Sequence, residues 1–175
     1  MRVQTCLLGL AVAAAASASF DSGALERVPM VNAAGACQPA LPAFDGNVRK
    51  RPTGVSNEGS ASAFVSCSVY GDLNVEVTAP SSGIGILLSN NTGSAVNISC
   101  TLVNGFRFIQ NPVTTSIPKT FAVPANQSVE VAITTADNGD EPFNTPIFNL
   151  SCNLPVGTEI NSLYTQIEDG SAPAG

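Results

Sequence analysis

The segment from Ala61 to Tyr70 has the sequence Ala-Ser-Ala-Phe-Val-Ser-Cys-Ser-Val-Tyr, in which small apolar residues alternate with mostly polar ones. Side chains at every second position share one face of a β-strand, whereas a helix repeats its faces every three or four residues. We therefore predict a half-buried strand here. Its predicted inward residues are Ala61, Ala63, Val65, Cys67 and Val69, and its outward residues are Ser62, Phe64, Ser66, Ser68 and Tyr70.

Two further segments with a cysteine, residues 96–102 and 148–152, show the same alternation and place Cys100 and Cys152 on inward faces. We predict other strands over residues 75–78, 84–89, 106–109, 119–123, 129–134 and 160–167, and turns at residues 90–93, 104–105, 124–126 and 137–140. Short strands separated by turn residues predict an all-β fold, an antiparallel β-sandwich of the immunoglobulin-like or jelly-roll-like kind.

The N-terminus has the layout of a secretory signal peptide. Arg2 supplies a positive charge, residues 7–16 form an apolar run, and Ala16-Ser17-Ala18 is a small-residue cleavage site. The apolar run is too short to span a bilayer as a permanent helix. We therefore expect residues 1–18 to be removed and the rest to be a soluble chain, secreted or periplasmic.

The remaining chain suffices for one domain with one core. Residues 19–36 have scattered charges and little apolar periodicity, so we predict a flexible leader. A β-sandwich over residues 37–167 and a flexible tail over residues 168–175 follow. Between Gln38 and Thr53, three prolines exclude a helix and favour irregular extended chain.

The chain contains five cysteines, of which Cys6 lies in the signal peptide. An even number of cysteines in an exported chain indicates two disulfides, here with three possible pairings. A zinc site is disfavoured, because no two of the remaining thiols lie within four residues of each other and the chain has no His. The remaining cysteines are Cys37, Cys67, Cys100 and Cys152.

Several short motifs together resemble a group of small exported bacterial proteins of unknown function. The matching segments are residues 37–40 (Cys-Gln-Pro-Ala), 54–57 (Gly-Val-Ser-Asn), 100–102 (Cys-Thr-Leu) and 152–155 (Cys-Asn-Leu-Pro). The similarity spans about residues 37–167. It implies a two-disulfide β-domain with an envelope or extracellular location, and it supplies no catalytic residue.

Within this two-disulfide framework we favour the pairs Cys37–Cys67 and Cys100–Cys152. Cys100 and Cys152 occupy matching inward positions on two core strands. That leaves Cys37 to connect the N-terminal arm to Cys67.

Catalytic chemistry finds little support in the sequence. Without His, neither a Ser-His-Asp triad nor a Cys-His pair can form. A Ser-Lys dyad would have to use Lys50 or Lys119, both close to a proline and outside any recognisable motif. The net charge of −6 argues against a nucleic-acid partner, and we interpret Arg49-Lys50-Arg51 as a solvated loop.

Carboxylates offer two alternatives. A pair could hydrolyse glycosidic bonds, although no pair has apolar neighbours that would raise one pKa. The turn with Asp137, Asp140 and Glu141 is a weak calcium candidate, because it offers several oxygen ligands but does not match an EF-hand loop. The carboxylates considered are Asp72, Glu76, Glu130, Asp137, Asp140, Glu141 and Glu159.

Outward aromatic residues suggest a recognition surface. Phe64 and Tyr70 share the outward side of one predicted strand, and Phe106 and Phe108 share one side of another. Such a row could bind a protein or glycan partner, but we favour the interpretation that this face of the strand packs beneath a neighbouring loop.

We expect a non-enzymatic structural or binding domain, monomeric, without cofactor, and without membrane contact after removal of the signal peptide. One alternative is a subunit of a fimbria-like surface polymer, completed by a strand from another chain. The other is a hydrolase that uses carboxylates.

Intact mass spectrometry of the exported protein tests the predicted processing and disulfides. We expect the mass of a chain that starts near Ser19 and does not react with an alkylating agent until it is reduced. An unprocessed N-terminus would contradict the predicted signal peptide, and alkylation without reduction would contradict the two disulfides.

Overall fold

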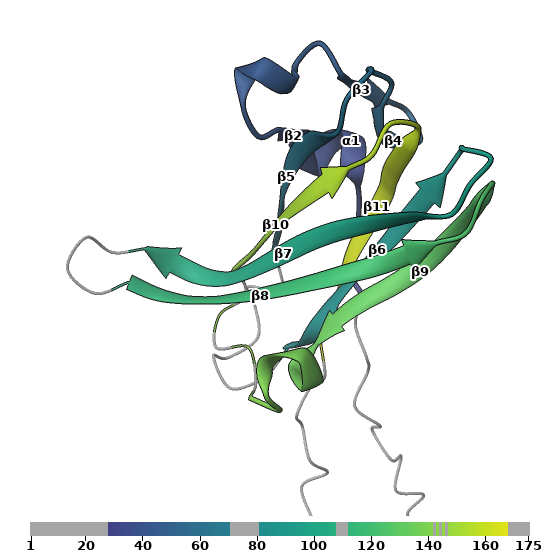
Figure 1. Cartoon of the computed structure of the whole chain (residues 1–175). Helices are drawn as coiled ribbons and strands as arrows, with labels where there is room; N and C mark the ends of the chain where they lie inside the picture. The colour runs from purple at the N-terminus through teal and green to yellow at the C-terminus, as the bar shows by residue number, and fades with distance from the viewer. Residues whose placement is uncertain are drawn as a thin grey trace, which may run out of the picture.

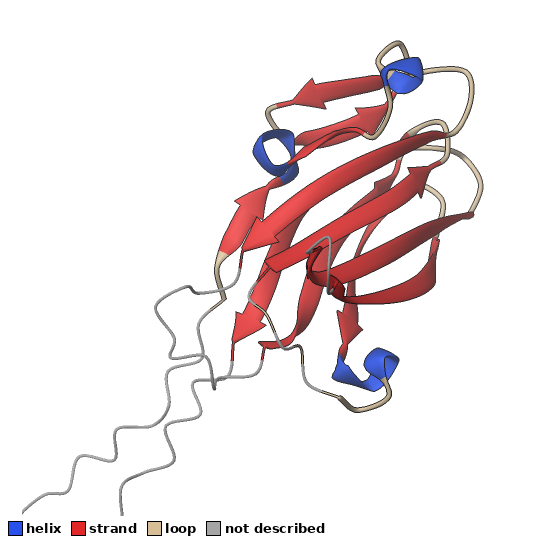
Figure 2. Cartoon of the chain, turned by 90° about the vertical axis from the view of Figure 1, so that its left-hand side faces the viewer, coloured by secondary structure: helices blue, strands red, loops and turns tan. Residues whose placement is uncertain are grey.

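The computed structural model describes residues 28–70, 81–107, 112–141, 143, 145 and 147–167. Two antiparallel β-sheets face each other in it (Figures 1 and 2). The predicted signal peptide, the strand expected over residues 75–78 and the predicted tail lie outside the described residues. None of the helices in the described parts of the chain has the length and hydropathy needed to cross a membrane.

Sheet A has the strand order β3-β4-β11-β6-β9, and β1 also pairs with β11. The C-terminal strand β11 therefore lies inside the sheet, with β6 on one side and β4 and β1 on the other. The strands of sheet A are β1 (Met30–Asn32), β3 (Val48–Arg51), β4 (Gly54–Asn57), β6 (Ser81–Asn90), β9 (Gln127–Thr134) and β11 (Thr158–Ile167).

Sheet B has the strand order β2-β5-β10-β7-β8. The ribbon formed by β7 and β8 extends past the neighbouring strands (Figure 1). Its strands are β2 (Cys37–Pro39), β5 (Ala63–Tyr70), β7 (Val96–Arg107), β8 (Pro112–Val123) and β10 (Ile147–Leu154). Three short helical segments complete the described fold: α1 (Ala33–Ala36), η1 (Pro42–Phe44) and η2 (Thr135–Asn138).

The core lies between the two sheets and follows the predicted alternation. Side chains at every second position of β5 and β10 are buried, and the intervening ones are more accessible. Fully burying each large aliphatic side chain contributes about 1.5–3 kcal/mol. Core residues at most 1% exposed include Val55, Ile84, Ile86, Leu88, Ile133, Ile160 and Leu163 from sheet A, and Val65, Ile98, Leu102, Phe148, Leu150 and Leu154 from sheet B.

Both disulfides lie within sheet B. Cys37 faces Cys67 directly across β2 and β5, and Cys100 faces Cys152 across β7 and β10. The Cα atoms are 3.9 and 4.0 Å apart, respectively, and all four residues are at most 3% exposed. These are the two pairs that we favoured from the sequence.

The ordered domain starts earlier than Cys37, where we had placed its boundary. β1 pairs with β11. The Asn32 side chain caps α1 by accepting a hydrogen bond from the Ala34 N–H at 2.8 Å. Ala33 is fully buried. Small residues give no periodic signal, but their size lets the chain pack close to its neighbours here.

The turn predicted at Asn104-Gly105 is wrong, because β7 continues through both residues to Arg107. Asn104 is 5% exposed, and its amide donates hydrogen bonds to the carbonyl oxygens of Thr145 and Ile147 at 2.9 and 3.1 Å. A distant loop thus satisfies the side chain and outweighs the local turn preference of Asn-Gly.

The segment between Gln38 and Thr53 is also more regular than predicted. It contains the 3-10 turn η1, with Pro42 at its first position, and the strand β3. Proline suits the first turn of a helix, because its fixed φ is already helical and the missing N–H has no partner there.

Removing either disulfide should lower the free energy of unfolding, because the unfolded chain regains the conformational entropy that the closed loop takes away. The bridged cysteines are 30 and 52 residues apart, and the two loops do not overlap. Replacing Cys37 and Cys67 with Ala should cost about 3.5 kcal/mol of unfolding free energy, and replacing Cys100 and Cys152 about 4 kcal/mol. Urea unfolding of the two double variants measures both. A loss below about 1 kcal/mol in either would contradict the bridge concerned.

Candidate functional site

The acidic turn considered for calcium is held together by its own hydrogen bonds. The Asp137 carboxylate accepts hydrogen bonds from the Lys119 ammonium at 2.7 Å and from the Thr134 N–H at 2.9 Å. Burial alone would raise the pKa of Asp137, but these bonds outweigh it and lower the pKa. Asp140 and Glu141 are exposed nearby. Within the described ranges, no three His, Cys, Asp or Glu side chains gather in a group that could hold a metal ion.

Lys119, a candidate for a Ser-Lys dyad, is bound to other groups of the fold in the same way. Its ammonium also donates a hydrogen bond to the Ala132 carbonyl at 2.9 Å and lies 5.8 Å from the centre of the Phe121 ring. The side chain therefore connects β8, β9 and η2 at the open edge of the sandwich. Lys50, the other candidate, is exposed on β3.

The basic cluster lies on an exposed strand rather than in a loop. Arg51 forms a two-bonded ion pair with Glu58, at 2.7 and 2.6 Å. The hydrogen bond from Arg51 holds the pKa of Glu58 below its ordinary value. Arg49 donates hydrogen bonds to the carbonyls of Asp45 and Val48.

Two further carboxylates lie on the outer face of sheet A. Glu159 is 9% exposed, and its Oε1 accepts hydrogen bonds at 3.0 Å from the Thr53 hydroxyl and the Asn161 amide. Glu130 accepts a hydrogen bond from the Tyr164 hydroxyl. The ring of Tyr164 occupies the space that a Cβ at Gly85 would need. These carboxylates connect neighbouring strands. Asp72 and Glu76 lie outside the described residues.

The outer face of sheet B differs from that of sheet A in the chemistry of its side chains. Its outward side chains that the structure describes are mostly hydroxyls and amides, and none of these carries a charge. The side chain of Arg107, at an outward position at the end of β7, lies outside what the structure describes. We call the part of the described set named below the polar face; Phe64, Tyr70, Thr114 and Ile147 also lie at outward positions but are not counted in it. It comprises Gln38, Ser66, Ser68, Asn97, Ser99, Thr101, Val103, Ser116, Pro118, Thr120, Ala122, Asn149, Ser151 and Asn153.

The strand register aligns the polar face in rows. Neighbouring residues in a row are about 4.8 Å apart, the spacing between adjacent strands. One row contains Gln38, Ser66, Ser151, Thr101 and Pro118, and the next contains Ser68, Asn149, Val103 and Ser116.

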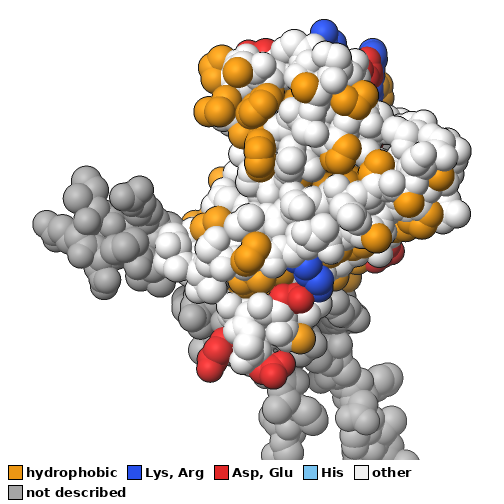
Figure 3. All heavy atoms as spheres, viewed as in Figure 1, with side chains coloured by type: hydrophobic (Ala, Val, Ile, Leu, Met, Phe, Trp, Pro, Cys, Tyr) orange, Lys and Arg blue, Asp and Glu red, His pale blue; other side chains and the backbone are white. Residues whose placement is uncertain are grey.

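Some of these side chains are fixed by bonds between strands. The Ser68 hydroxyl donates to Asn149 Oδ1 at 3.0 Å, and the hydroxyls of Ser99 and Thr120 are 2.9 Å apart. Figure 3 looks onto this side of the molecule. Uncharged polar side chains and backbone cover much of its centre, with hydrophobic side chains scattered among them, and charged side chains lie at its upper end and in its lower half.

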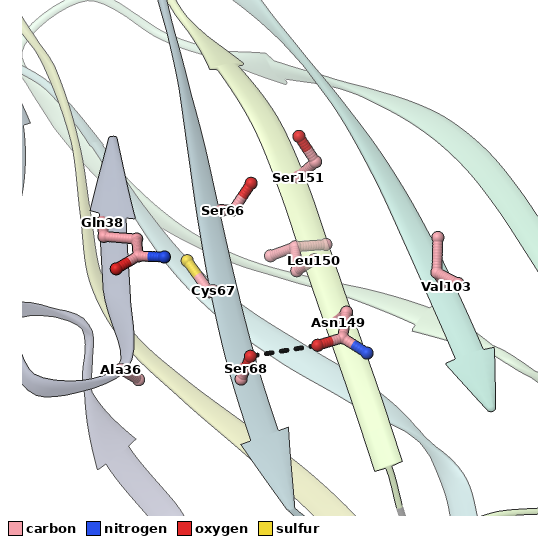
Figure 4. A pocket seen from close by; sticks show the side chains of 9 residues that line it. All are labelled: Ala36, Gln38, Ser66, Cys67, Ser68, Val103, Asn149, Leu150 and Ser151. Atoms are coloured by element: carbon pink, nitrogen blue, oxygen red, sulfur yellow. Dashed lines mark hydrogen bonds between the residues drawn. The ribbon is translucent and has the colours of Figure 1, made fainter. Parts of the chain in front are cut away.

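A cleft of about 400 Å³ opens on the polar face, where β2, β5 and β10 adjoin (Figure 4). Gln38 of β2 stands on one side of it and Asn149 and Ser151 of β10 on the other, with Ser66 and Ser68 of β5 between the two strands. Its volume falls in the range of about 300–1,000 Å³ that is usual for ligand pockets. Its lining residues are Ala36, Gln38, Ser66, Cys67, Ser68, Val103, Asn149, Leu150 and Ser151.

Two aromatic residues lie on the same side of β5 as the cleft. Phe64 and Tyr70 point outward, as predicted, and are 44% and 60% exposed. Phe64 also contacts Phe44, with ring centres 6.1 Å apart. Of the second predicted aromatic row, Phe108 and the side chain of Phe106 lie outside what the structure describes.

Reasoning from the sequence predicted the outward residues of β5 and the outward direction of Asn149 and Ser151, but it did not predict that these two residues and Gln38 lie beside β5. The cysteine pairs could have predicted which strands lie side by side. Once Cys37 is paired with Cys67, Gln38 must lie beside Ser66. Once Cys152 is paired with Cys100, Ser151 must lie beside Thr101.

No protein-family model and no curated protein matches this chain. Solved structures with a similar arrangement include an exo-β-1,3-galactanase from Phanerochaete chrysosporium with galactose (7% identity, TM-score 0.47), covering 79% of this chain and 29% of that one. A carbohydrate-binding module, CBM36, in complex with calcium and xylotriose (11%, 0.40) covers 78% and 98%, respectively. The Tobacco streak virus coat protein (9%, 0.32) covers 85% and 90%.

The chain spans less than a third of the galactanase. At these identities and TM-scores, the likeness extends to the general arrangement of β-strands and no further.

The contact between Tyr164 and Glu130 can be tested by titration. The hydrogen bond to Glu130, together with burial, raises the pKa of Tyr164 to about 12. An unfolded Tyr ionises near pH 10. The stabilisation is therefore complete below about pH 10 and is lost as the pH rises toward about 12.

Absorbance titration of the phenolate should show a step near pH 12 that Tyr164→Phe removes. Between about pH 9 and about pH 11, Tyr164→Phe should also lose less unfolding free energy than the wild type. Equal losses in both proteins would contradict the assignment.

Proposed function

We propose that this protein is an exported, non-catalytic binding domain, and that the polar face is its interaction surface. The observation that supports this most directly is the chemistry of that face. An ordered array of uncharged hydroxyl and amide side chains surrounds a cleft on a sheet that two disulfides cross-link.

A non-catalytic role agrees with the use of the ionisable groups. Asp137 pairs with Lys119, Glu58 with Arg51, and Glu130 with Tyr164. Each of these contacts connects segments of the fold. Such pairs contribute to structure, whereas a catalytic carboxylate needs a neighbouring group that tunes its pKa toward the pH of the reaction.

Export is supported by the predicted signal peptide and by the two disulfides, which persist in oxidising compartments. We include in the proposal the resemblance to small exported bacterial proteins, and with it a location in the envelope or outside the cell.

We favour a self-contained monomer over a subunit of a fimbria-like polymer. A subunit of that kind leaves a place in its sheet for a strand from another chain. Here β11, the last strand that the structure describes, fills an interior place in sheet A of its own domain.

A charge placed in the polar face should abolish binding. The purified full chain is incubated with envelope and extracellular material of the source organism, and the retained fraction is compared between Ser151→Arg and Ser128→Arg. Ser128 lies on the outer face of sheet A. We expect Ser151→Arg to lower retention by about tenfold or more, because it places an unpaired charge in the interface.

Ser128→Arg adds the same charge elsewhere and should be retained like the wild type. Thermal unfolding verifies that both variants fold, and sedimentation determines the oligomeric state. Equal retention of all three proteins, or an equal loss in both variants, would contradict the polar face as the interaction surface.

A further inference from the structure

We propose that the ligand of the polar face is a neutral polysaccharide, bound as an extended chain across the cleft between β2, β5 and β10. This inference rests on the proposed function, since it names the class of ligand for the same surface. It follows from the charge, the hydrogen-bonding groups and the dimensions of the face.

The first argument is electrostatic. The chain carries a net charge of −6, yet no side chain described around the cleft between β2, β5 and β10 carries a charge. A charged ligand would lose hydration there without gaining an opposite charge. The described charged pairs lie elsewhere, with Arg51–Glu58 at β3 and Lys119–Asp137 beside η2. An uncharged ligand suits this surface best.

The second argument concerns hydrogen bonds. Hydroxyl and carboxamide groups both donate and accept, as do the hydroxyls of a sugar. Gln38 and Asn149 place one carboxamide on each side of the cleft (Figure 4). Ser68 occupies Asn149 Oδ1, and the amide nitrogen of Asn149 lies on the side away from Ser68. The cleft thus presents donors and acceptors without the hydration cost of a charge.

The third argument concerns size and shape. Phe64 and Tyr70 are six residues apart on β5, about 20 Å along an extended strand. The cleft lies between them, beside Ser66 and Ser68. Exposed aromatic rings bury the apolar C–H face of a sugar ring and leave its hydroxyls accessible. A surface of this length suits several linked sugar units better than a monosaccharide.

The test measures binding of the full-length mature protein to a panel of polysaccharides. Xylan, mixed-linkage β-glucan, galactan and dextran are the neutral members, polygalacturonate is the acidic one, and chitosan is the basic one. We expect at least one neutral polymer to bind. Its affinity should change less than about twofold between about 0.05 M and about 0.5 M NaCl, since no ion pairs form.

Matched variants locate the binding site. Tyr70→Ala should weaken binding by about tenfold or more, and Asn149→Ala or Gln38→Ala by about threefold or more. Met30→Ala removes a side chain of similar exposure (64%, against 60% for Tyr70) from sheet A, and Asn91→Ala removes an exposed amide from a turn. Both controls should bind like the wild type.

The outcomes separate the ligand class from the proposed function. Salt-sensitive binding to polygalacturonate or chitosan, if Ser151→Arg abolishes it, would overturn the neutral ligand and leave the polar face as the interaction surface. The neutral ligand would also be overturned, and the polar face would stand, if no neutral polymer bound while envelope material still retained the wild type but not Ser151→Arg. A dimer that Ser151→Arg dissociates would likewise overturn the neutral ligand and leave the polar face as the interaction surface. Binding that the controls weaken as much as Tyr70→Ala would overturn both proposals.

Discussion

The register of sheet B is the constraint on which the candidate surface depends. Successive side chains of a strand point to opposite faces, so a slip by one residue would exchange the inward and outward sets. Each disulfide joins two cysteines that face each other directly, Cys37 with Cys67 and Cys100 with Cys152. All four side chains are buried, which fixes the inward set of four strands. The hydroxyls and amides on the alternate positions are thereby directed outward.

The two outer faces of the sandwich use their polar groups differently. On sheet A, Glu159 accepts hydrogen bonds from Thr53 and Asn161, and Tyr164 lies over Gly85 and donates to Glu130. These contacts hold neighbouring strands to one another and bring charged groups onto that face. The described outward side chains of sheet B are uncharged. Its strands are held by backbone ladders, by the two disulfides and by side-chain hydrogen bonds such as that of Ser68 with Asn149. We assign binding to sheet B because its described outward side chains are uncharged and because the cleft opens among them.

Much of the fold follows from local patterns. The alternation in residues 61–70, 96–102 and 148–152 predicted three strands of sheet B and the faces of their cysteines, and the structure agrees. Ala61 is the exception, because it was predicted to face inward but lies exposed before β5 begins at Ala63. The prediction was wrong where a distant contact outweighs a local preference. Asn104 donates hydrogen bonds to Thr145, before β10, and to Ile147, the first residue of β10, and it stays within a strand. Residues 30–36 are ordered because β1 pairs with β11, more than a hundred residues further along the chain.

The candidate surface was only partly predictable. The alternation within a strand predicts which of its residues point outward, but it does not predict which strands lie beside it. The outward positions of β5 followed from the alternation in its sequence. The cleft is also lined by β10, which lies between β5 and β7 in the sheet. About eighty residues separate β10 from β5 along the chain. Sequence order alone would place β5 beside β6, which in fact belongs to the other sheet. The cysteine pattern is the exception to this rule. A bond between Cys100 and Cys152 requires β7 and β10 to adjoin, so the disulfide pairing by itself aligns the outward residues of these two strands in one surface.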